Sequence, residues 1–191
     1  LNEWAFRFPN ALCALLTVLL VYFAGRRLFS EETGFISAIV LCSSFSFLAM
    51  ARIVTLDMCF AFLLFLSLCS CALYFRQGGR RYLIVFYLSL ACATLTKGPV
   101  AVVLVGATVF LYSLTERTAR PLLSLLWLPG IALYLVVAAP WFVLIGLREK
   151  EFIYFFFVDQ HILRFLTTQH KRSGPFYYFI PVLLGGLLPW T

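Results

Sequence analysis

The 191-residue sequence is poor in charge, since Asp, Glu, Lys and Arg together make up only 12% of it. Soluble domains are about a quarter charged and about half apolar. Here 63% of the residues are hydrophobic and the mean hydropathy is +0.97. A water-soluble domain is therefore excluded. The composition indicates an all-α integral membrane protein, because a helix satisfies its backbone groups within its own segment in lipid.

Several other features are missing. The sequence has no repeat, no low-complexity segment and no Gly-rich phosphate loop, which argues against nucleotide binding within the chain, and nothing in it indicates a nucleic-acid partner. No basic segment with a small-residue cleavage site precedes the first apolar stretch. The chain opens at Leu1 and stops inside an apolar run. We therefore expect an internal piece of a longer polytopic protein.

The six cysteines lack the paired spacing of a zinc or disulfide framework. All of them lie inside apolar stretches: Cys13, Cys42, Cys59, Cys69, Cys71 and Cys92. We interpret them as small buried or lipid-facing hydrophobic residues.

Seven apolar stretches are predicted to be helices, because crossing a bilayer takes about 20 apolar residues. They cover residues 10–25, 34–51, 57–75, 82–96, 99–115, 122–147 and 176–191. The sixth stretch contains Pro129 and Pro140, so we expect a kinked or tilted span there. The prediction is a multi-span helical bundle with about seven spans.

Basic residues in the short connections predict the orientation. The connections after the first, third and fifth stretches hold seven arginines: Arg26, Arg27, Arg76, Arg80, Arg81, Arg117 and Arg120. The opposite short connections hold only Arg52 and Lys97, with Arg7 before the first stretch. The positive-inside rule places the arginine-rich face in the cytoplasm. Five basic residues in the connection 148–175 count against this orientation.

The connection 148–175 is too patterned for a plain loop. Blocks of aromatic and aliphatic residues alternate there with polar residues such as Asp159 and Gln160. A helix lying in the interface with its aromatic side toward lipid satisfies this pattern. We predict an extracytoplasmic loop that contains an interfacial amphipathic helix.

Ionisable residues gather at the face opposite the arginines: Arg52, Asp57, Lys97, His161 and Arg164. A charged residue at the centre of a spanning helix costs roughly 2.5–3.5 kcal/mol on insertion scales, so such groups usually face a cavity and carry function. The convergence of these residues predicts a functional site at that face.

Asp57 and Lys97 each admit two interpretations. Asp57 starts the third predicted helix after Thr55, which is a capping arrangement, or its carboxylate faces a cavity as a metal ligand or as the charge partner of Arg52. Lys97 precedes Gly98 and Pro99 in a tight turn, where it snorkels to headgroups or binds a phosphate as a point charge. We favour the phosphate interpretation for Lys97 and leave both open for Asp57.

His161 and Arg164 are three residues apart and share one face of a helix. One histidine and Asp57 provide only two metal ligands, whereas a zinc site takes three or four from protein, so a metal site is at most partial here. Arg52, Lys97 and Arg164, with the imidazole, describe a place for a phosphate headgroup above an apolar bundle. A lipid phosphate is the ligand that this arrangement predicts.

Six short motifs occur in order along the chain. They are Arg7-Phe8-Pro9-Asn10-Ala11, Gly25-Arg26-Arg27-Leu28-Phe29, Ala51-Arg52-Ile53-Val54-Thr55-Leu56-Asp57, Leu95-Thr96-Lys97-Gly98-Pro99, His161-Ile162-Leu163-Arg164-Phe165 and Gly174-Pro175-Phe176-Tyr177-Tyr178-Phe179-Ile180-Pro181. With this spacing the sequence resembles the membrane glycosyltransferases of the protein-mannosyltransferase type. Within them it is most similar to the 4-amino-4-deoxy-L-arabinose transferases that modify lipid A, over essentially all 191 residues.

The resemblance implies that residues 1–191 are part of one transmembrane domain with the GT-C fold. It implies a polyprenyl-phosphate-linked sugar donor, a glycolipid such as lipid A, a glycan or a protein hydroxyl as acceptor, and a site on the extracytoplasmic face of the bacterial inner membrane. Asp57 and His161 match positions that help to hold a divalent metal, which would be zinc, magnesium or manganese. Lys97 matches a lysine near the donor phosphate, and Arg164 is expected to be a second neighbour of that phosphate. The general base and a third metal ligand are expected upstream of Leu1.

Two other functions remain open. A transporter or flippase for a lipid-linked anion needs the same basic cavity, although transporters often show internal repeats and none is found here. A non-catalytic membrane assembly subunit needs the charges only as interfacial anchors.

Overall fold

The computed structural model describes residues 2–149, 151, 152, 154, 156 and 176–191, and every regular element in these residues is helical. The elements are α1 (Glu3–Leu28), α2 (Glu31–Ser43), α3 (Phe45–Arg52), α4 (Asp57–Gln77), α5 (Arg80–Lys97), α6 (Val100–Thr115), α7 (Arg120–Ser124), α8 (Leu128–Arg148), η3 (Phe176–Tyr178) and α10 (Phe179–Leu187). The predicted all-α class is confirmed. The predicted loop 148–175 lies almost entirely outside the described residues.

The number of spans differs from the prediction of about seven. Within the described residues, α1, α4 and α8 are long and apolar enough to cross a membrane, and α2 with α3 forms a fourth candidate bent by 62°. Helix α6 has only 16 residues, and the stretch 176–191 contains the nine-residue α10, which is too short to cross. By length and composition, the described helices therefore provide three full spans, or four if the bent pair is counted as one.

The break between α2 and α3 has a local cause in two adjacent serines. The hydroxyl of Ser43 donates to the carbonyl of Ile39 at 2.6 Å, and that of Ser44 donates to Val40 at 2.6 Å. Such bonds compete with the helical ladder, and serine pairs are a known cause of kinks. Ser44 has an extended backbone, and the predicted single helix 34–51 is wrong at this point.

The predicted stretch 122–147 is also divided. Its first residues belong to the short helix α7, and α8 begins at Leu128 with Pro129 in its first turn, where the missing N–H costs nothing. Pro140 lies inside α8. At the other end of the chain, α1 begins at Glu3, seven residues before the prediction, because the Asn2 side chain caps its first turn.

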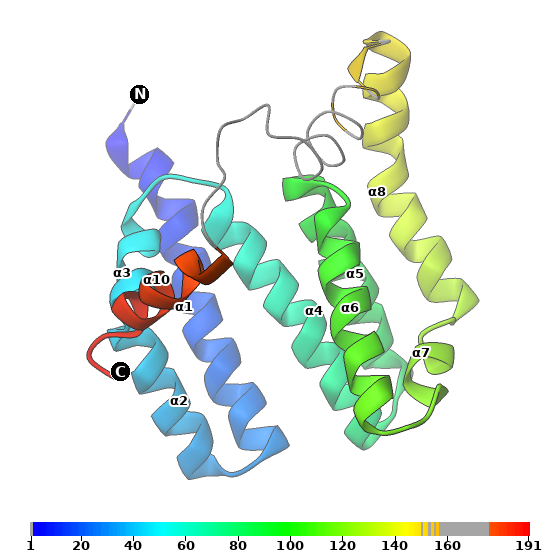
Figure 1. Ribbon diagram of the computed structural model, residues 1–191. Helices are drawn as coiled ribbons and strands as arrows, with labels where there is room; N and C mark the ends of the chain where they lie inside the picture. Colours follow the sequence, from blue (N-terminus) through cyan, green and yellow to red (C-terminus); the bar gives the residue numbers. More distant parts are fainter. Residues whose placement is uncertain (1, 150, 153, 155, 157–175) are drawn as a thin grey trace.

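The chain runs up and down through the bundle (Figure 1). The amino end of α1, the α3–α4 turn, the α5–α6 turn and the end of α8 lie at one end of the molecule, at the top of Figure 1. The α1–α2, α4–α5 and α6–α8 connections, which carry the seven arginines, lie at the other end. Arg52, Asp57 and Lys97 therefore share one end, as the sequence predicted.

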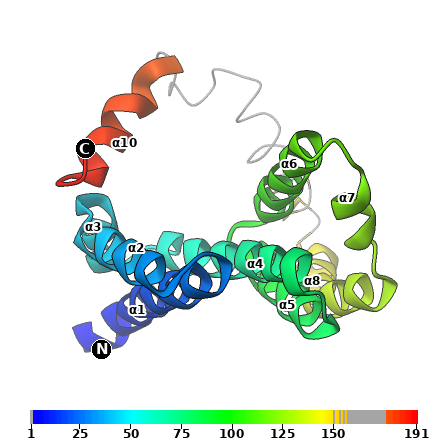
Figure 2. The ribbon, with the colours of Figure 1, turned by 90° about the horizontal axis from the view of Figure 1, so that it is seen from below.

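The bundle is built around α4 and α5. Seen from below, the helices α1, α2, α4, α5 and α8 form a row, while α6 and α10 both stand on the same side of it (Figure 2). The buried core lies between α4, α5 and α6: Cys71, Phe86, Tyr87, Leu90, Ala93, Ala101, Val105 and Val109. Many large apolar side chains elsewhere are exposed, as expected of surfaces that face lipid or further helices.

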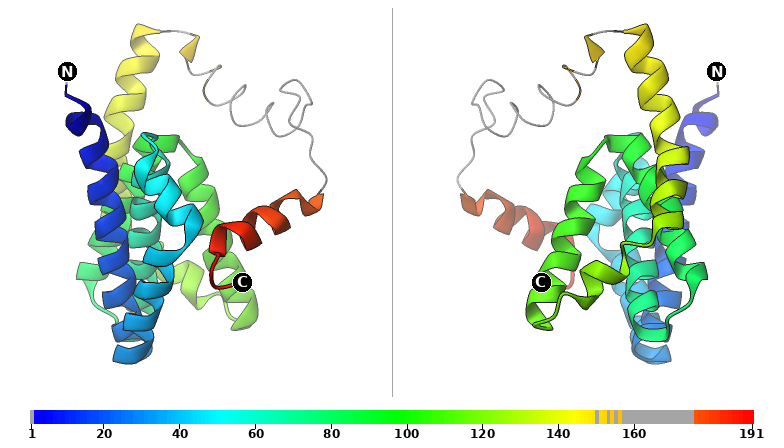
Figure 3. Two further views of the ribbon diagram at one scale, coloured as in Figure 1. Left: turned by 90° about the vertical axis from the view of Figure 1, so that its left-hand side faces the viewer. Right: turned by 90° about the vertical axis from the view of Figure 1, so that its right-hand side faces the viewer.

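Helix α10 packs beside α3 and runs at a steep angle to the long helices (Figure 3). The amide of Phe45 donates to the carbonyl of Leu188 at 3.1 Å, and the Trp190 indole donates to the Ser43 hydroxyl at 2.9 Å. The bend at Ser44 therefore supplies polar groups that bind the segment around α10.

Two glycines allow α1 and α2 to approach closely. A Cβ on Gly34 would lie 2.5 Å from the carbonyl oxygen of Tyr22 and 2.7 Å from the amide nitrogen of Arg26. A Cβ on Gly25 would lie 2.7 Å from the Cα of Gly34. Small residues at a membrane helix interface permit this separation, and the atoms in the way are backbone, which has no room to move.

We expect Gly34→Ala to destabilise the protein by about 1–3 kcal/mol, the usual cost of overpacking. The measurement is thermal unfolding of the full-length protein in detergent. Gly106→Ala in α6 is the matched control, since nothing lies within 4 Å of a Cβ there. Equal effects of the two substitutions would contradict the close α1–α2 packing.

Candidate functional site

Asp57 and Lys97 meet at the end of the bundle opposite the arginines. Asp57 is the first residue of α4 and Lys97 is the last of α5, and these antiparallel helices pack side by side. The Lys97 ammonium donates to a carboxylate oxygen of Asp57, and the two side chains are 40% and 38% exposed. The pair is therefore at the rim of the bundle, within reach of a ligand.

The turn after Lys97 fixes the end of α5. Gly98 has φ +79°, a conformation that favours glycine, and its amide donates to the carbonyl of Thr94 at 2.7 Å. Pro99 holds the capping position before α6, with a backbone angle suited to a helix. This short turn holds Lys97 at a defined point between two helices.

Phe60 provides a second contact for the ammonium. The Lys97 nitrogen lies 5.4 Å from the centre of the Phe60 ring, within the range of a cation–π interaction. Phe60 follows Asp57 by three residues, so both lie on the same face of α4. Phe60 was not predicted from the sequence, although its spacing from Asp57 was the available signal.

The partner of Asp57 is Lys97 and not Arg52, the partner considered from the sequence. Arg52 is exposed at the end of α3, and it makes no ion pair with Asp57 in the described structure. The capping interpretation is also not observed, since Leu56 holds the capping position of α4 without a side-chain bond. The Thr55 hydroxyl is buried beside the turn that leads to Asp57.

An apolar cavity of about 620 Å³ opens beside the ion pair. Its walls come from the end of α2, α3, the start of α4 and one face of α10. Apart from Asp57, Lys97 and two serines, the side chains that line it are apolar, for example Met50, Met58 and Leu183. A cavity with this lining and one charged edge suits an amphipathic ligand with a polar or charged head.

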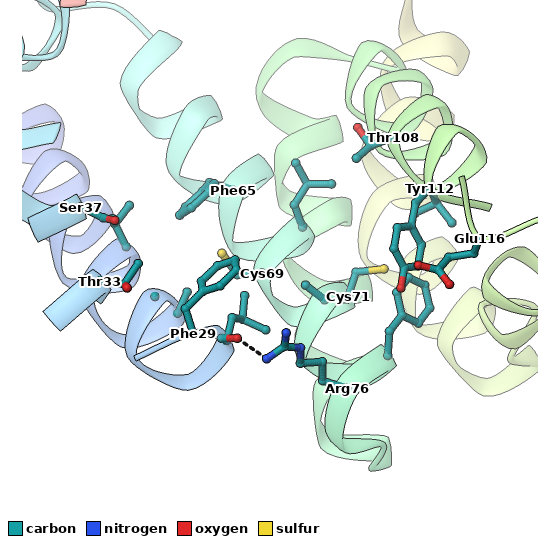
Figure 4. Close-up of a pocket in the computed structure, with 18 residues that line it drawn as sticks. Phe29, Thr33, Ser37, Phe65, Cys69, Cys71, Arg76, Thr108, Tyr112 and Glu116 are labelled. Atoms are coloured by element: carbon teal, nitrogen blue, oxygen red, sulfur yellow. Dashed lines mark hydrogen bonds between the residues drawn. The ribbon is translucent and has the colours of Figure 1, made fainter. Parts of the chain in front are cut away.

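A larger cavity of about 730 Å³ lies toward the arginine-rich end, between α1, α2, α4 and α6 (Figure 4). Arg76 at its edge donates to the carbonyl of Leu28, the last residue of α1, and lies 5.8 Å from the Phe29 ring centre. Arg76 therefore has a structural role at the end of a helix. Neither Asp57 nor Lys97 reaches this cavity, so the smaller one is the candidate site.

His161 and Arg164 lie outside the described residues, so their predicted roles stay predictions. Among the described residues, no group of three or more His, Cys, Asp or Glu side chains is placed to hold a metal ion. Asp57 alone, already paired with Lys97, does not make a metal site.

Asn10 is a second residue near the site whose role was not predicted from the sequence. Its side-chain amide donates to the carbonyl of Ile53, in the turn that leads to Asp57. The sequence pointed to Asn10 only as a member of one of the six ordered motifs.

The chain matches known membrane transferases over its whole length. The sequence model of the family described as "Dolichyl-phosphate-mannose-protein mannosyltransferase" matches residues 1–144. The undecaprenyl phosphate-alpha-4-amino-4-deoxy-L-arabinose arabinosyl transferase of Pseudomonas aeruginosa (strain UCBPP-PA14) is 32% identical, with 100% of this chain and 35% of that protein aligned. The enzyme of the same description from Erwinia tasmaniensis is 29% identical over the same shares of the two chains.

Two solved structures have the same arrangement of helices. The crystal structure of ArnT from Cupriavidus metallidurans bound to undecaprenyl phosphate has a TM-score of 0.92 and 31% identity, covering 100% of this chain and 36% of that one. The apo structure gives a TM-score of 0.89 and 30% identity, covering 100% and 35%. This chain thus spans about a third of the length of the relatives that it matches.

We expect the Asp57–Lys97 pair to contribute little to stability, because exposed ion pairs are worth about 0–1 kcal/mol. Asp57→Asn and Lys97→Met should each change the free energy of unfolding by less than about 1 kcal/mol. Phe86→Ala in the core serves as the reference and should cost about 3–5 kcal/mol. Thermal unfolding in detergent measures all three. A loss at Asp57 or Lys97 as large as that at Phe86 would mean that the pair is a structural anchor.

Proposed function

The chain belongs to the dolichyl-phosphate-mannose-protein mannosyltransferase family, and from this membership we propose that it is a membrane portion of a glycosyltransferase. The fold expected from the sequence, a GT-C-type helical bundle, is confirmed by the likeness to ArnT. The proposed reaction transfers a sugar from a polyprenyl-phosphate-linked donor to an acceptor hydroxyl. The observation that carries this proposal is the ammonium of Lys97 at the edge of an apolar cavity of about 620 Å³.

The cavity has the polarity of the proposed donor. A polyprenyl phosphate combines a long apolar tail with a compact anionic head, and the cavity combines apolar walls with a charged edge. Lysine is a good point-charge ligand for phosphate. In support, the similar ArnT structure is described as bound to undecaprenyl phosphate, and the similar arabinosyl transferases are named for a donor on that carrier.

Lys97 would act on the leaving group. As the bond between the anomeric carbon and the phosphate oxygen breaks, its electron pair stays with the phosphate, and negative charge grows there. A preorganised ammonium stabilises that charge more in the transition state than in the ground state. The acceptor oxygen forms the new bond to the anomeric carbon, and its proton passes to a base that is expected upstream of Leu1.

Arg52 and Arg164 are proposed as further phosphate contacts. Arg52 lies at the end of α3, at the same end of the bundle as Lys97. For Arg164 the support is the sequence motif, because this residue is outside the described part of the chain. Arginine binds phosphate with two parallel hydrogen bonds, which adds orientation to the charge provided by Lys97.

A glycolipid is the acceptor that we favour over a glycan or a protein hydroxyl. A second apolar cavity, of about 520 Å³, lies beyond the Lys97 turn between Thr94, Pro99 and α8. The Tyr134 hydroxyl bonds the Thr94 hydroxyl at 3.2 Å, and the rest of the lining is apolar. Apolar cavities on both sides of the turn would accommodate the tails of two lipid substrates.

The protein is an integral membrane protein, and we propose that the site faces the extracytoplasmic side of the bacterial inner membrane. The seven arginines at the opposite end support this orientation through the positive-inside rule.

Replacing Lys97 tests the transferase proposal. In the full-length protein in nanodiscs, with undecaprenyl-phosphate aminoarabinose and lipid A, we expect Lys97→Ala to lower kcat by roughly 100- to 1,000-fold, as for other charge-stabilising donors. Lys97→Arg should retain part of the activity because it keeps the charge. Arg120→Ala, at the opposite end of the bundle, is the control and should leave turnover unchanged.

Two outcomes would favour the other functions. Movement of labelled donor across the bilayer without cleavage of the sugar–phosphate bond would indicate a transporter or flippase. Unchanged function in both Lys97→Ala and Asp57→Asn would indicate an assembly subunit.

A divalent ion shared by Asp57 and His161 is a separate proposal that rests on the resemblance. The described residues do not form a metal site by themselves, and no step of the proposed reaction depends on the ion. If the ion is required, a chelator should inactivate the full-length enzyme and zinc, magnesium or manganese should restore it, but not in His161→Ala. Indifference of the wild-type enzyme to the chelator would reject the metal.

A further inference from the structure

A buried amide links α1 to the turn that carries Asp57. The Asn10 side chain is only 6% exposed, and its nitrogen donates to the carbonyl oxygen of Ile53. Ile53 follows the last residue of α3, so its carbonyl belongs to the connection between α3 and α4. The two residues are 43 positions apart, and the bond is a tertiary contact between elements.

The carbonyl of Ile53 accepts a second hydrogen bond within its own turn. The amide of Thr55 donates to it at 3.0 Å. One oxygen therefore joins α1 to the segment between Arg52 and Asp57. A buried polar group away from water is costly unless it is bonded, so loss of the Asn10 donor would leave the Ile53 carbonyl with its local bond alone.

A comparison with Thr17 shows that burial alone does not explain why the Asn10 side chain bonds another element. Both side chains belong to α1, both are polar, and both are 6% exposed. The Thr17 hydroxyl, however, bonds the carbonyl of Cys13 in its own helix at 2.7 Å. Asn10 instead bonds another element, and that element leads directly to the ion pair.

We propose that Asn10 is a positioning residue for the phosphate-binding end of the site. This proposal rests on the proposed function. By fixing the turn 53–56, Asn10 sets the start of α4 and thus the location of the Asp57 carboxylate. The carboxylate in turn orients the ammonium of Lys97. A displacement of about 1 Å in a catalytic group, caused by a distant substitution, can cost about 100-fold in rate.

Asn10→Leu removes the amide at nearly constant size, and Thr17→Val is the matched control in the same helix. Amide hydrogen exchange in the full-length protein in nanodiscs gives a readout that does not depend on activity. We expect Asn10→Leu to speed exchange of the Thr55 amide at least about tenfold, as expected when a local opening becomes easier. Thr17→Val should leave the exchange of Thr55 unchanged, and Asn10→Gln, which keeps a donor, should fall between the two.

Turnover provides the second readout. We expect Asn10→Leu to lower kcat/KM for the lipid-linked donor by about 10- to 100-fold. In a Lys97→Ala background the same substitution should cause little further loss, because coupled positions are not additive. Equal exchange and equal turnover in Asn10→Leu and Thr17→Val would overturn the proposal, as would a full additional loss in the Lys97→Ala background.

The two proposals fail in different ways. If the wild-type protein transfers no sugar, the proposed function fails, and a faster Thr55 exchange in Asn10→Leu still identifies Asn10 as the residue that fixes the turn. If wild type transfers sugar and Asn10→Leu matches Thr17→Val, only the positioning role is rejected.

Discussion

Inside a bilayer every backbone donor and acceptor has to find its partner within the protein, and this requirement governs the ends of the helices. Three side chains donate to carbonyl groups at or just after the end of a helix. Asn10 bonds Ile53 after α3, Arg76 bonds Leu28 at the end of α1, and the Tyr87 hydroxyl bonds Leu125 after α7. Each bond also joins two elements that are distant in sequence. These contacts therefore satisfy the backbone and also tie distant parts of the bundle to one another.

The ion pair of Asp57 and Lys97 follows a different principle. Asp57 begins α4 and Lys97 ends α5 at the same rim of the bundle, where a charge costs less than at the bilayer centre. Their mutual contact neutralises both groups beside an apolar cavity. A bound phosphate would offer Lys97 a second anion at this rim, which is consistent with the proposed role of Lys97.

The sequence predicted the class of the protein and its up-and-down path, because composition and the distribution of arginines depend on the solvent rather than on particular contacts. It missed the break at Ser44, since two serines within an apolar run give no composition signal. It placed Asp57 and Lys97 at one face but not in contact. Alternation along the chain fixes the end at which a residue lies, whereas helix packing decides which residues at that end are neighbours. The link from Asn10 to Ile53 was hidden for the same reason.

The bend at Ser44 has a consequence for the order in which the protein is made. The Phe45 amide bonds the carbonyl of Leu188, and the Ser43 hydroxyl bonds the Trp190 indole. Ser43 and Trp190 are 147 positions apart. The same late segment forms one wall of the cavity beside Lys97. During insertion into the membrane, α1 to α8 enter first, and that wall is added only when α10 reaches α3. The charged rim is therefore synthesised long before the cavity beside it is complete, so the cavity forms only at a late stage of insertion.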